Sequence, residues 1–181
     1  MTKEESLPKL KLVLAVLVLG ISLSCTQQKT VTNAPAPSPS GVSPARHSVD
    51  VVKVSALETE IARSQTGDAL VHLDIEKGYH VNANPPTFPY LKATELTLPQ
   101  SPSVSVSFIV YPNPLTKSFP FAEKPLAVYE GTTTIKVKLK VDKAAQTGKQ
   151  NLAGKLLVQA CDEQVCYAPG TLDVSIPLSI K

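Results

Sequence analysis

Two cysteines near the end of the chain, Cys161 and Cys166, are the residues whose type and spacing best suit chemistry. Four residues separate them. An apolar run precedes the pair, and a Pro-Gly turn with a final alternating segment follows it. If this stretch folds as a hairpin, the two sulfurs lie across adjacent strands and can close a small ring. The chemistry to consider is therefore a disulfide that is made and broken.

A structural disulfide is the simplest alternative, because most disulfides in exported domains are structural. The loop that it would close is short, and chain entropy then contributes only roughly 2 kcal/mol. A metal site is not predicted, because two thiolates are too few ligands for a closed zinc site. Neither His72 nor His80 is expected near the pair, and His72 is expected on a strand surface. Structural and redox-active disulfides both stay open at this point.

The residues between the cysteines bear on reactivity. Asp162 and Glu163 follow Cys161 directly, and no Lys, Arg or His lies inside the ring. Nearby negative charge disfavours the thiolate, which is the reactive form of cysteine. A redox-active pair in this setting would be a slow nucleophile by itself. It would depend on a docked partner for activation.

Short alternating segments must position this ring. In residues 69–75 and 132–141 apolar and polar side chains alternate, as in half-buried strands. No convincing amphipathic helix occurs. Further strands are expected at residues 49–54, 78–83, 93–98, 103–110, 126–129, 152–160 and 172–180. This pattern predicts an all-β fold, an immunoglobulin-like antiparallel β-sandwich. The chain has no tryptophan, so a true antibody domain is not expected.

The N-terminus is expected to be an export signal. Lysines in residues 1–11 precede a short apolar run at residues 12–23, too short for a membrane span. Small residues before Cys25 resemble a bacterial lipobox, so we expect residues 1–24 to be a signal peptide and Cys25 to carry lipid. Thr26 then favours the outer membrane. The alternative is a plain secretory signal with an incidental Cys25. Lipidation would leave Cys161 and Cys166 as an even pair.

Residues 25–47 are polar and rich in Pro, Ser and Thr, so we expect a lipid-anchored, extended tether. Residues 48–181 form the expected domain. Thirteen Lys and Arg balance thirteen Asp and Glu there. A neutral domain gives no electrostatic reason to bind nucleic acid or a membrane surface. Contact with the membrane is expected only through the anchor, on the periplasmic side of the cell envelope.

Several motifs together resemble a known family. They are Gly78-Tyr79-His80-Val81, Tyr111-Pro112, Val128-Tyr129-Glu130-Gly131 and Val158-Gln159-Ala160-Cys161 with Cys166-Tyr167-Ala168-Pro169. From about residue 50 to the end, the chain resembles the N-terminal periplasmic domain of the thiol:disulfide interchange protein DsbD. The cysteine spacing is one residue shorter than in the best-known member, and Asn82 stands where an aromatic residue is often found.

The resemblance implies an immunoglobulin-like sandwich whose cysteine pair accepts electrons from a thioredoxin-like donor, without a cofactor. The acceptors would be disulfide isomerases or other oxidised exported proteins. Cys166 would form the mixed disulfide and Cys161 would resolve it. We expect the donor to be a separate polypeptide, because the chain has neither the membrane domain nor the thioredoxin-like domain of DsbD.

The resemblance also implies a cap loop over the pair. Residues 115–121 are the candidate, with Phe119 or Phe121 as the shielding side chain. Their alternative role is to anchor a loop in the core. Tyr79 and Tyr167 are expected beside the sulfurs, or else in the sandwich core. No Ser-His-Asp arrangement suggests a hydrolase, so the remaining alternative function is a non-catalytic lipoprotein binding module with a structural disulfide.

Overall fold

The computed structural model describes residues 46–181. The predicted signal peptide, Cys25 and most of the predicted tether lie outside the described residues. The elements of the described part are η1 (Ser48–Val51, a 3-10 helix), β1 (Val52–Ala56), β2 (Thr59–Ile61), β3 (Thr66–Ile75), β4 (His80–Asn82), β5 (Glu95–Thr97), β6 (Val104–Val110), β7 (Leu115–Lys117), β8 (Leu126–Tyr129), β9 (Thr132–Val141), β10 (Gly148–Val158), β11 (Ala160–Cys161) and β12 (Gly170–Ile180).

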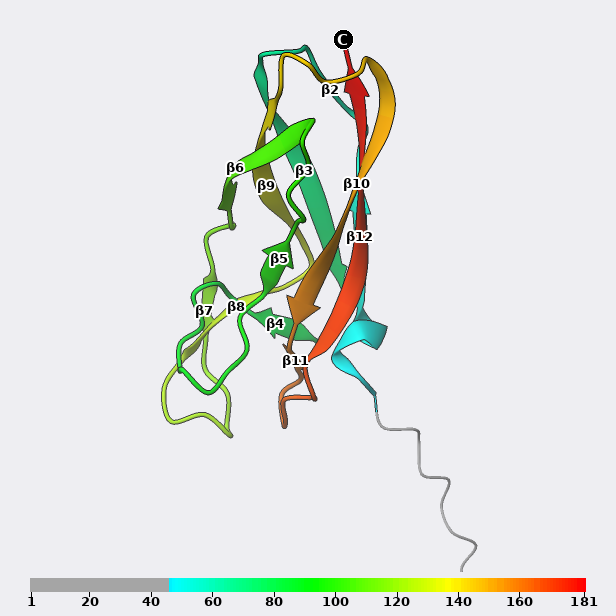
Figure 1. Cartoon of the computed structure of the whole chain (residues 1–181). Helices are drawn as coiled ribbons and strands as arrows, with labels where there is room; N and C mark the ends of the chain where they lie inside the picture. Colours follow the sequence, from blue (N-terminus) through cyan, green and yellow to red (C-terminus); the bar gives the residue numbers. More distant parts are fainter. Residues whose placement is uncertain (1–45) are drawn as a thin grey trace, which may run out of the picture. The chain divides into compact units, whose positions relative to one another are not determined.

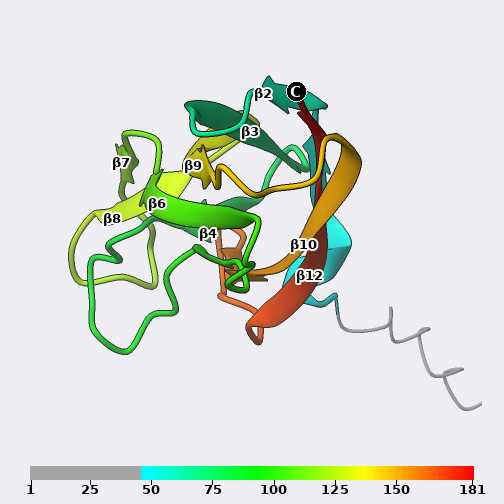
Figure 2. The same ribbon diagram turned by 45° about the horizontal axis from the view of Figure 1, so that its top comes forward.

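Two four-stranded sheets form the sandwich. One has the strand order β1-β3-β9-β6 and the other β2-β12-β10-β5. Strands β10 and β12 form the longest antiparallel pair and lie side by side in both views (Figures 1 and 2). The pairing is antiparallel throughout these sheets except between β12 and β2. The predicted all-β, immunoglobulin-like sandwich is confirmed.

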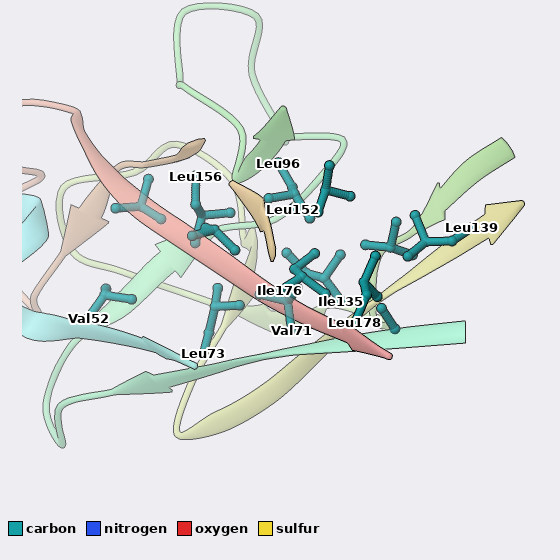
Figure 3. Close-up of a cluster of buried hydrophobic side chains, with 14 of the residues drawn as sticks. Val52, Val71, Leu73, Leu96, Ile135, Leu139, Leu152, Leu156, Ile176 and Leu178 are labelled. Carbon is teal, nitrogen blue, oxygen red and sulfur yellow. The ribbon is translucent and has the colours of Figure 1, made fainter. Parts of the chain in front are cut away.

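The core lies between these two sheets. Its side chains come from the inward positions of alternating strands, as the period of two requires. Figure 3 shows Val71, Leu73 and Ile135 of one sheet close to Leu156 and Ile176 of the other. All five are fully or almost fully buried. Burial of this apolar surface is the main driving force that holds the sheets together.

A third, smaller sheet carries the cysteines. Its order is β11-β4-β8-β7, and it lies at the end of the domain away from the C-terminus (Figure 1). Ala160 of β11 pairs with Val81 of β4, and both side chains join the main core. Their neighbours Cys161 and His80 therefore point to the opposite face, because successive side chains alternate along a strand.

Two local predictions are wrong. Residues 48–51 form η1 instead of the start of a strand, which begins at Val52. Residues 115–117, expected in a loop, form strand β7 and pair with β8. Within residues 46–181, no helix has the length and apolar character that crossing a membrane requires.

Candidate functional site

A hairpin built on β11 holds the cysteine pair. Cys161 ends β11, and Cys166 faces it as an isolated antiparallel bridge with the two Cα atoms 3.9 Å apart. The structure joins the two residues in a disulfide. Cys161 is fully buried, whereas Cys166 is partly exposed and its neighbour Val165 is 51% exposed. The two residues joined by the bond therefore differ in their exposure to solvent.

Asp162 fixes the conformation of the ring between the cysteines. Its Oδ1 accepts hydrogen bonds from the backbone N–H groups of Gln164 (2.7 Å) and Val165 (2.9 Å). Its Oδ2 accepts a hydrogen bond from the Tyr167 hydroxyl at 2.5 Å. This bond lowers the pKa of Asp162 and raises the pKa of Tyr167 to about 12. The carboxylate next to Cys161 in the sequence thus stabilises the turn by accepting three hydrogen bonds.

The base of the hairpin is held by two polar side chains from outside the ring. The buried Ser48 hydroxyl donates to the Ala168 carbonyl (2.6 Å) and accepts from the Ala160 N–H (2.9 Å). Gln159 accepts hydrogen bonds at Oε1 from the Asn82 side chain (3.0 Å) and the Lys92 backbone (2.8 Å). These contacts connect the hairpin to η1 and to the segment around β4. Sequence reasoning did not identify Ser48, because its role depends on a contact across the domain.

His80 lies directly opposite Cys161 in the β4–β11 pair. Side chains in such positions share one face, with Cβ atoms about 4.5–5.5 Å apart. The prediction that neither histidine is near the cysteines is therefore wrong for His80. His72 lies in β3 instead, where its Nδ1 is 3.0 Å from the Thr134 hydroxyl. The signal for His80 was its place in the Gly-Tyr-His-Val strand, but the sequence did not reveal which strand pairs with β11.

The His80 side chain is buried and makes no polar contact within the protein. It is 1% exposed, and both ring nitrogens lack a hydrogen-bond partner. Burial, together with the nearby positive charge of Lys117, lowers the pKa of His80 to about 4. The carboxylates of Glu130, Glu163 and Asp162 act in the opposite direction, each with a smaller effect on the pKa than burial or Lys117. The imidazole is consequently neutral at neutral pH and keeps one N–H that donates to nothing.

An aromatic stack covers His80. The Phe119 ring lies 4.1 Å from the His80 ring, centroid to centroid, and the Phe121 ring lies 5.4 Å from the Phe119 ring. Phe119 is 4% exposed and belongs to a small apolar cluster with Leu126 and Val128, whereas Phe121 is 41% exposed. The stack thus runs from the face shared with Cys161 to the surface. Of the two predicted shielding residues, Phe119 is the one in contact with this face.

Lys117 links strand β7 to the ring. Its Nζ lies 2.7 Å from Glu130 and 3.1 Å from Glu163, and it also lies over the Phe119 ring at 5.4 Å. The Glu130 and Glu163 contacts raise the pKa of Lys117. Gly131 follows Glu130 with φ of 60°, a conformation that glycine adopts without strain. A positive charge thus lies beside the ring even though the ring sequence contains none.

The two predicted tyrosines lie near each other and against the main core. The Tyr79 and Tyr167 rings are 6.1 Å apart, and both pack against the main core while staying partly exposed. Arg46 pairs with Glu76 at 3.0 Å and lies over the Tyr79 ring at 5.3 Å. The end of the predicted tether therefore contacts the domain. Among residues 46–181, no group of three His, Cys, Asp or Glu side chains is placed to hold a metal ion.

Comparisons with known proteins identify similar domains. The family model described as "Thiol:disulfide interchange protein DsbD, N-terminal" matches residues 48–177. Among solved structures, the N-terminal periplasmic domain of ScsB from Proteus mirabilis is 23% identical with a TM-score of 0.46, and the match covers 72% of this chain and 47% of that one.

Two further structures are more distant. The major pilin subunit BcpA of Bacillus cereus is 12% identical with a TM-score of 0.33, over 72% of this chain and 40% of that one. A PapD-like domain of human CEP192 is 12% identical with a TM-score of 0.29, over 81% and 98% of the two chains. This chain spans less than half of the ScsB and BcpA chains that it matches. No curated protein matches its sequence.

Proposed function

Because the chain belongs to the family of the N-terminal domain of the thiol:disulfide interchange protein DsbD, we propose that it relays electrons through a reversible Cys161–Cys166 disulfide. The donor is a thioredoxin-like dithiol. The acceptor is a disulfide isomerase or another oxidised exported protein. The observation that carries this proposal is the unequal burial of a disulfide held in a surface hairpin.

Unequal burial supports distinct roles for the two sulfurs. A thiolate attacks a disulfide in line with the bond, so it needs access to one sulfur while the other leaves. Cys166 is partly exposed and Cys161 is buried. Cys166 is therefore the sulfur that forms the mixed disulfide, and Cys161 is the leaving and resolving sulfur. The exposed Val165 beside it offers an apolar contact to a docked partner.

The electrons balance in two half-reactions. A donor thiolate attacks Cys166 Sγ, and the electron pair of the broken bond leaves on Cys161 Sγ. The second donor thiolate then attacks the donor sulfur of the mixed disulfide, and Cys166 leaves as a thiolate. The donor becomes a disulfide and this chain a dithiol. In the second half-reaction the Cys166 thiolate attacks the acceptor disulfide, and the Cys161 thiolate attacks Cys166 Sγ. The acceptor leaves as two thiolates, which take up protons from water.

Reduction of the full chain tests this proposal. The chain is equilibrated with glutathione or dithiothreitol mixtures, and free thiols are trapped, with Cys25→Ser as the background so that only the pair is counted. Exchange proteins have potentials of roughly −120 to −270 mV, whereas structural disulfides typically lie below about −300 mV. A reversible couple in the first range, with the fold retained on reduction, is the expected result. A bond that resists reduction, or whose loss unfolds the domain, would favour the non-catalytic binding module instead.

We further propose that residues 1–24 direct export, that Cys25 is lipidated and that residues up to 47 tether the domain at the periplasmic side of the cell envelope, with the outer membrane as the favoured location. The sequence before Cys25 supports this proposal. Lipid incorporation into the wild-type chain, and its loss with Cys25→Ser, would be the expected result. Equal recovery of both chains from the soluble periplasmic fraction would contradict it.

A further inference from the structure

The oxidised protein contains an unused hydrogen-bond donor on the face that it shares with the leaving sulfur. Among the described residues, the buried side-chain nitrogen and oxygen atoms without a partner are the two ring nitrogens of His80 and Oδ1 of Asn82. Unpaired buried polar groups are uncommon and costly, and their occurrence calls for an explanation. His80 faces Cys161 in the strand register, and Phe119 covers its ring.

Opening of the disulfide places a negative charge on this face that must be stabilised. When the bond breaks toward Cys161, a negative charge forms on a sulfur that is fully buried in the oxidised protein. Burial without a partner disfavours a thiolate. The charged groups around this face are Lys117 of β7, Glu130 after β8, and Asp162 and Glu163 of the ring. Three of these four are negative, and Lys117 already pairs with Glu130 and Glu163.

We propose that the His80 imidazole stabilises the Cys161 thiolate by donating to it the N–H hydrogen bond that the oxidised protein leaves unmade. This inference rests on the proposed function, because it assigns a group to the exchange step. The electron pair of the broken bond goes to Cys161 Sγ, and the proton stays on the ring nitrogen. In the reverse step the same bond holds the Cys161 thiolate on the face from which it attacks Cys166.

The environment of His80 suits this role. Burial keeps the ring neutral in the oxidised state, so His80 adds no positive charge to the buried face before a partner docks. A thiolate opposite the ring favours the imidazolium, so the His80 pKa should be higher in the reduced protein than in the oxidised protein. Phe119 restricts the ring by stacking on it. The hydrogen-bond donor of His80 is thus in place before the negative charge develops on Cys161 Sγ.

The first test measures the Cys161 thiol directly. In the full chain with Cys25→Ser and Cys166→Ala, the ultraviolet absorbance of the thiolate gives the pKa of Cys161. His80→Phe keeps an aromatic ring against Phe119 and removes the N–H, so the thiolate fraction at a given pH should fall on the order of 10- to 100-fold, the effect of one hydrogen bond to a charged group. His80→Asn, which supplies an amide donor, should restore part of it.

The control is His72→Phe, which removes a histidine from β3 in a different sheet and should leave the thiolate fraction of Cys161 unchanged. The second test follows reduction of the Cys161–Cys166 disulfide by reduced thioredoxin in the Cys25→Ser chain. His80→Phe should slow the first step by a similar factor. If the parent chain is not reduced at all, the proposed function fails. If it is reduced but His80→Phe changes neither the thiol pKa nor this rate, the inference about His80 is overturned.

A third measurement needs no change at His80 and holds even if His80→Phe does not fold. Nuclear magnetic resonance of the Cys25→Ser chain gives the titration of His80 in the oxidised and reduced states. The expected result is a higher pKa after reduction. An equal or lower pKa in the reduced state would overturn the proposed contact with the thiolate.

Discussion

Lys117 Nζ lies 3.1 Å from Glu163, and this ion pair joins strand β7 to the ring closed by the Cys161–Cys166 disulfide. The same amino group lies 2.7 Å from Glu130, at the turn between β8 and β9. Three segments that are separate in sequence therefore meet at one charge. Because Phe119 follows two residues after Lys117, the contact also ties the stacked phenylalanine to the ring.

Replacing Lys117 should expose the disulfide. In Lys117→Met the apolar stem is kept and both ion pairs are lost, so reduction by dithiothreitol should be faster by roughly a factor of two to five, since a partly exposed ion pair is worth at most about 1 kcal/mol. Thiol trapping over time measures the rate. Lys149→Met, which breaks the Glu58 ion pair at 3.2 Å, is the matched control. Equal rates in all three chains would show that Lys117 does not restrict access.

The two phenylalanines of the candidate cap should differ in their effect on stability. Phe119 is 4% exposed and Phe121 is 41% exposed. Phe119→Ala should lower the free energy of unfolding by about 3–5 kcal/mol, the usual cost in a core, and Phe121→Ala by less than about 1 kcal/mol. Urea denaturation of both variants measures this. A small loss with Phe119→Ala would mean that the side chain is a movable shield instead of an anchor.

Tyr167→Phe should remove the bond that holds Asp162. Its loss should lower the free energy of unfolding at neutral pH by about 1 kcal/mol, given the partial exposure of both groups. The pKa of Asp162 is lowered in the folded protein, so this contribution is present above the ordinary value of 3.8 and is lost as pH falls through the lowered pKa. Denaturation at neutral and strongly acidic pH should show the difference shrinking on acidification. A difference independent of pH would point to packing instead of the hydrogen bond.

His80 should make the oxidised protein sensitive to mild acid. Its pKa falls from 6.5 to about 4 through burial, so the unfolded chain binds a proton in this interval that the folded chain does not. The free energy of unfolding should therefore decrease as pH falls from 6.5 to 4, by up to about 3 kcal/mol. The difference between the denaturation curves of wild type and His80→Phe across this interval gives the contribution of His80 to the free energy of unfolding. Parallel pH profiles for the two chains would rule it out, and His72→Phe serves as the control.

Ser48→Ala should weaken the base of the hairpin. The change leaves the Ala160 N–H and the Ala168 carbonyl without the hydroxyl that pairs with both, so a loss of about 1–3 kcal/mol is expected. Ser175→Ala is a suitable control, because that exposed hydroxyl contacts only the Asn151 side chain. Thermal unfolding of both variants measures the difference. Similar stability of the two would contradict a role for Ser48 in holding the hairpin.

The strands with a clear period of two were predictable from sequence. Residues 132–141 coincide with β9, and residues 69–75 lie within β3. Local alternation sets these elements because one face must be buried. Short strands such as β2 and β7 carry too few residues for a pattern, and their pairing partners decide their form. The 3-10 helix at the start of the domain was mistaken for a strand for a similar reason, since valines at 49, 51 and 52 fit either a strand or a 3-10 turn.

The cysteine pair was predictable, but its surroundings were not. The sequence places Asp162 and Glu163 beside Cys161, so the expected site was acidic and contained neither a cation nor an imidazole. The third sheet brings Lys117 and His80 to the same place through pairing that no local signal encodes. Contacts between residues far apart in the sequence depend on strand order, and the local pattern of a single sequence does not reveal that order.

Ser48 also has a mechanical consequence. Its hydroxyl connects the first turn of the described chain to both sides of the cysteine hairpin, and η1 lies beside the adjoining end of β12 (Figures 1 and 2). A pulling force applied to the chain ahead of Arg46 would first meet the exposed Arg46–Glu76 ion pair and then this contact. Tension on the N-terminal side would therefore be passed through the Ser48 hydroxyl to both sides of the cysteine hairpin, so the way in which the domain is held bears directly on the ring.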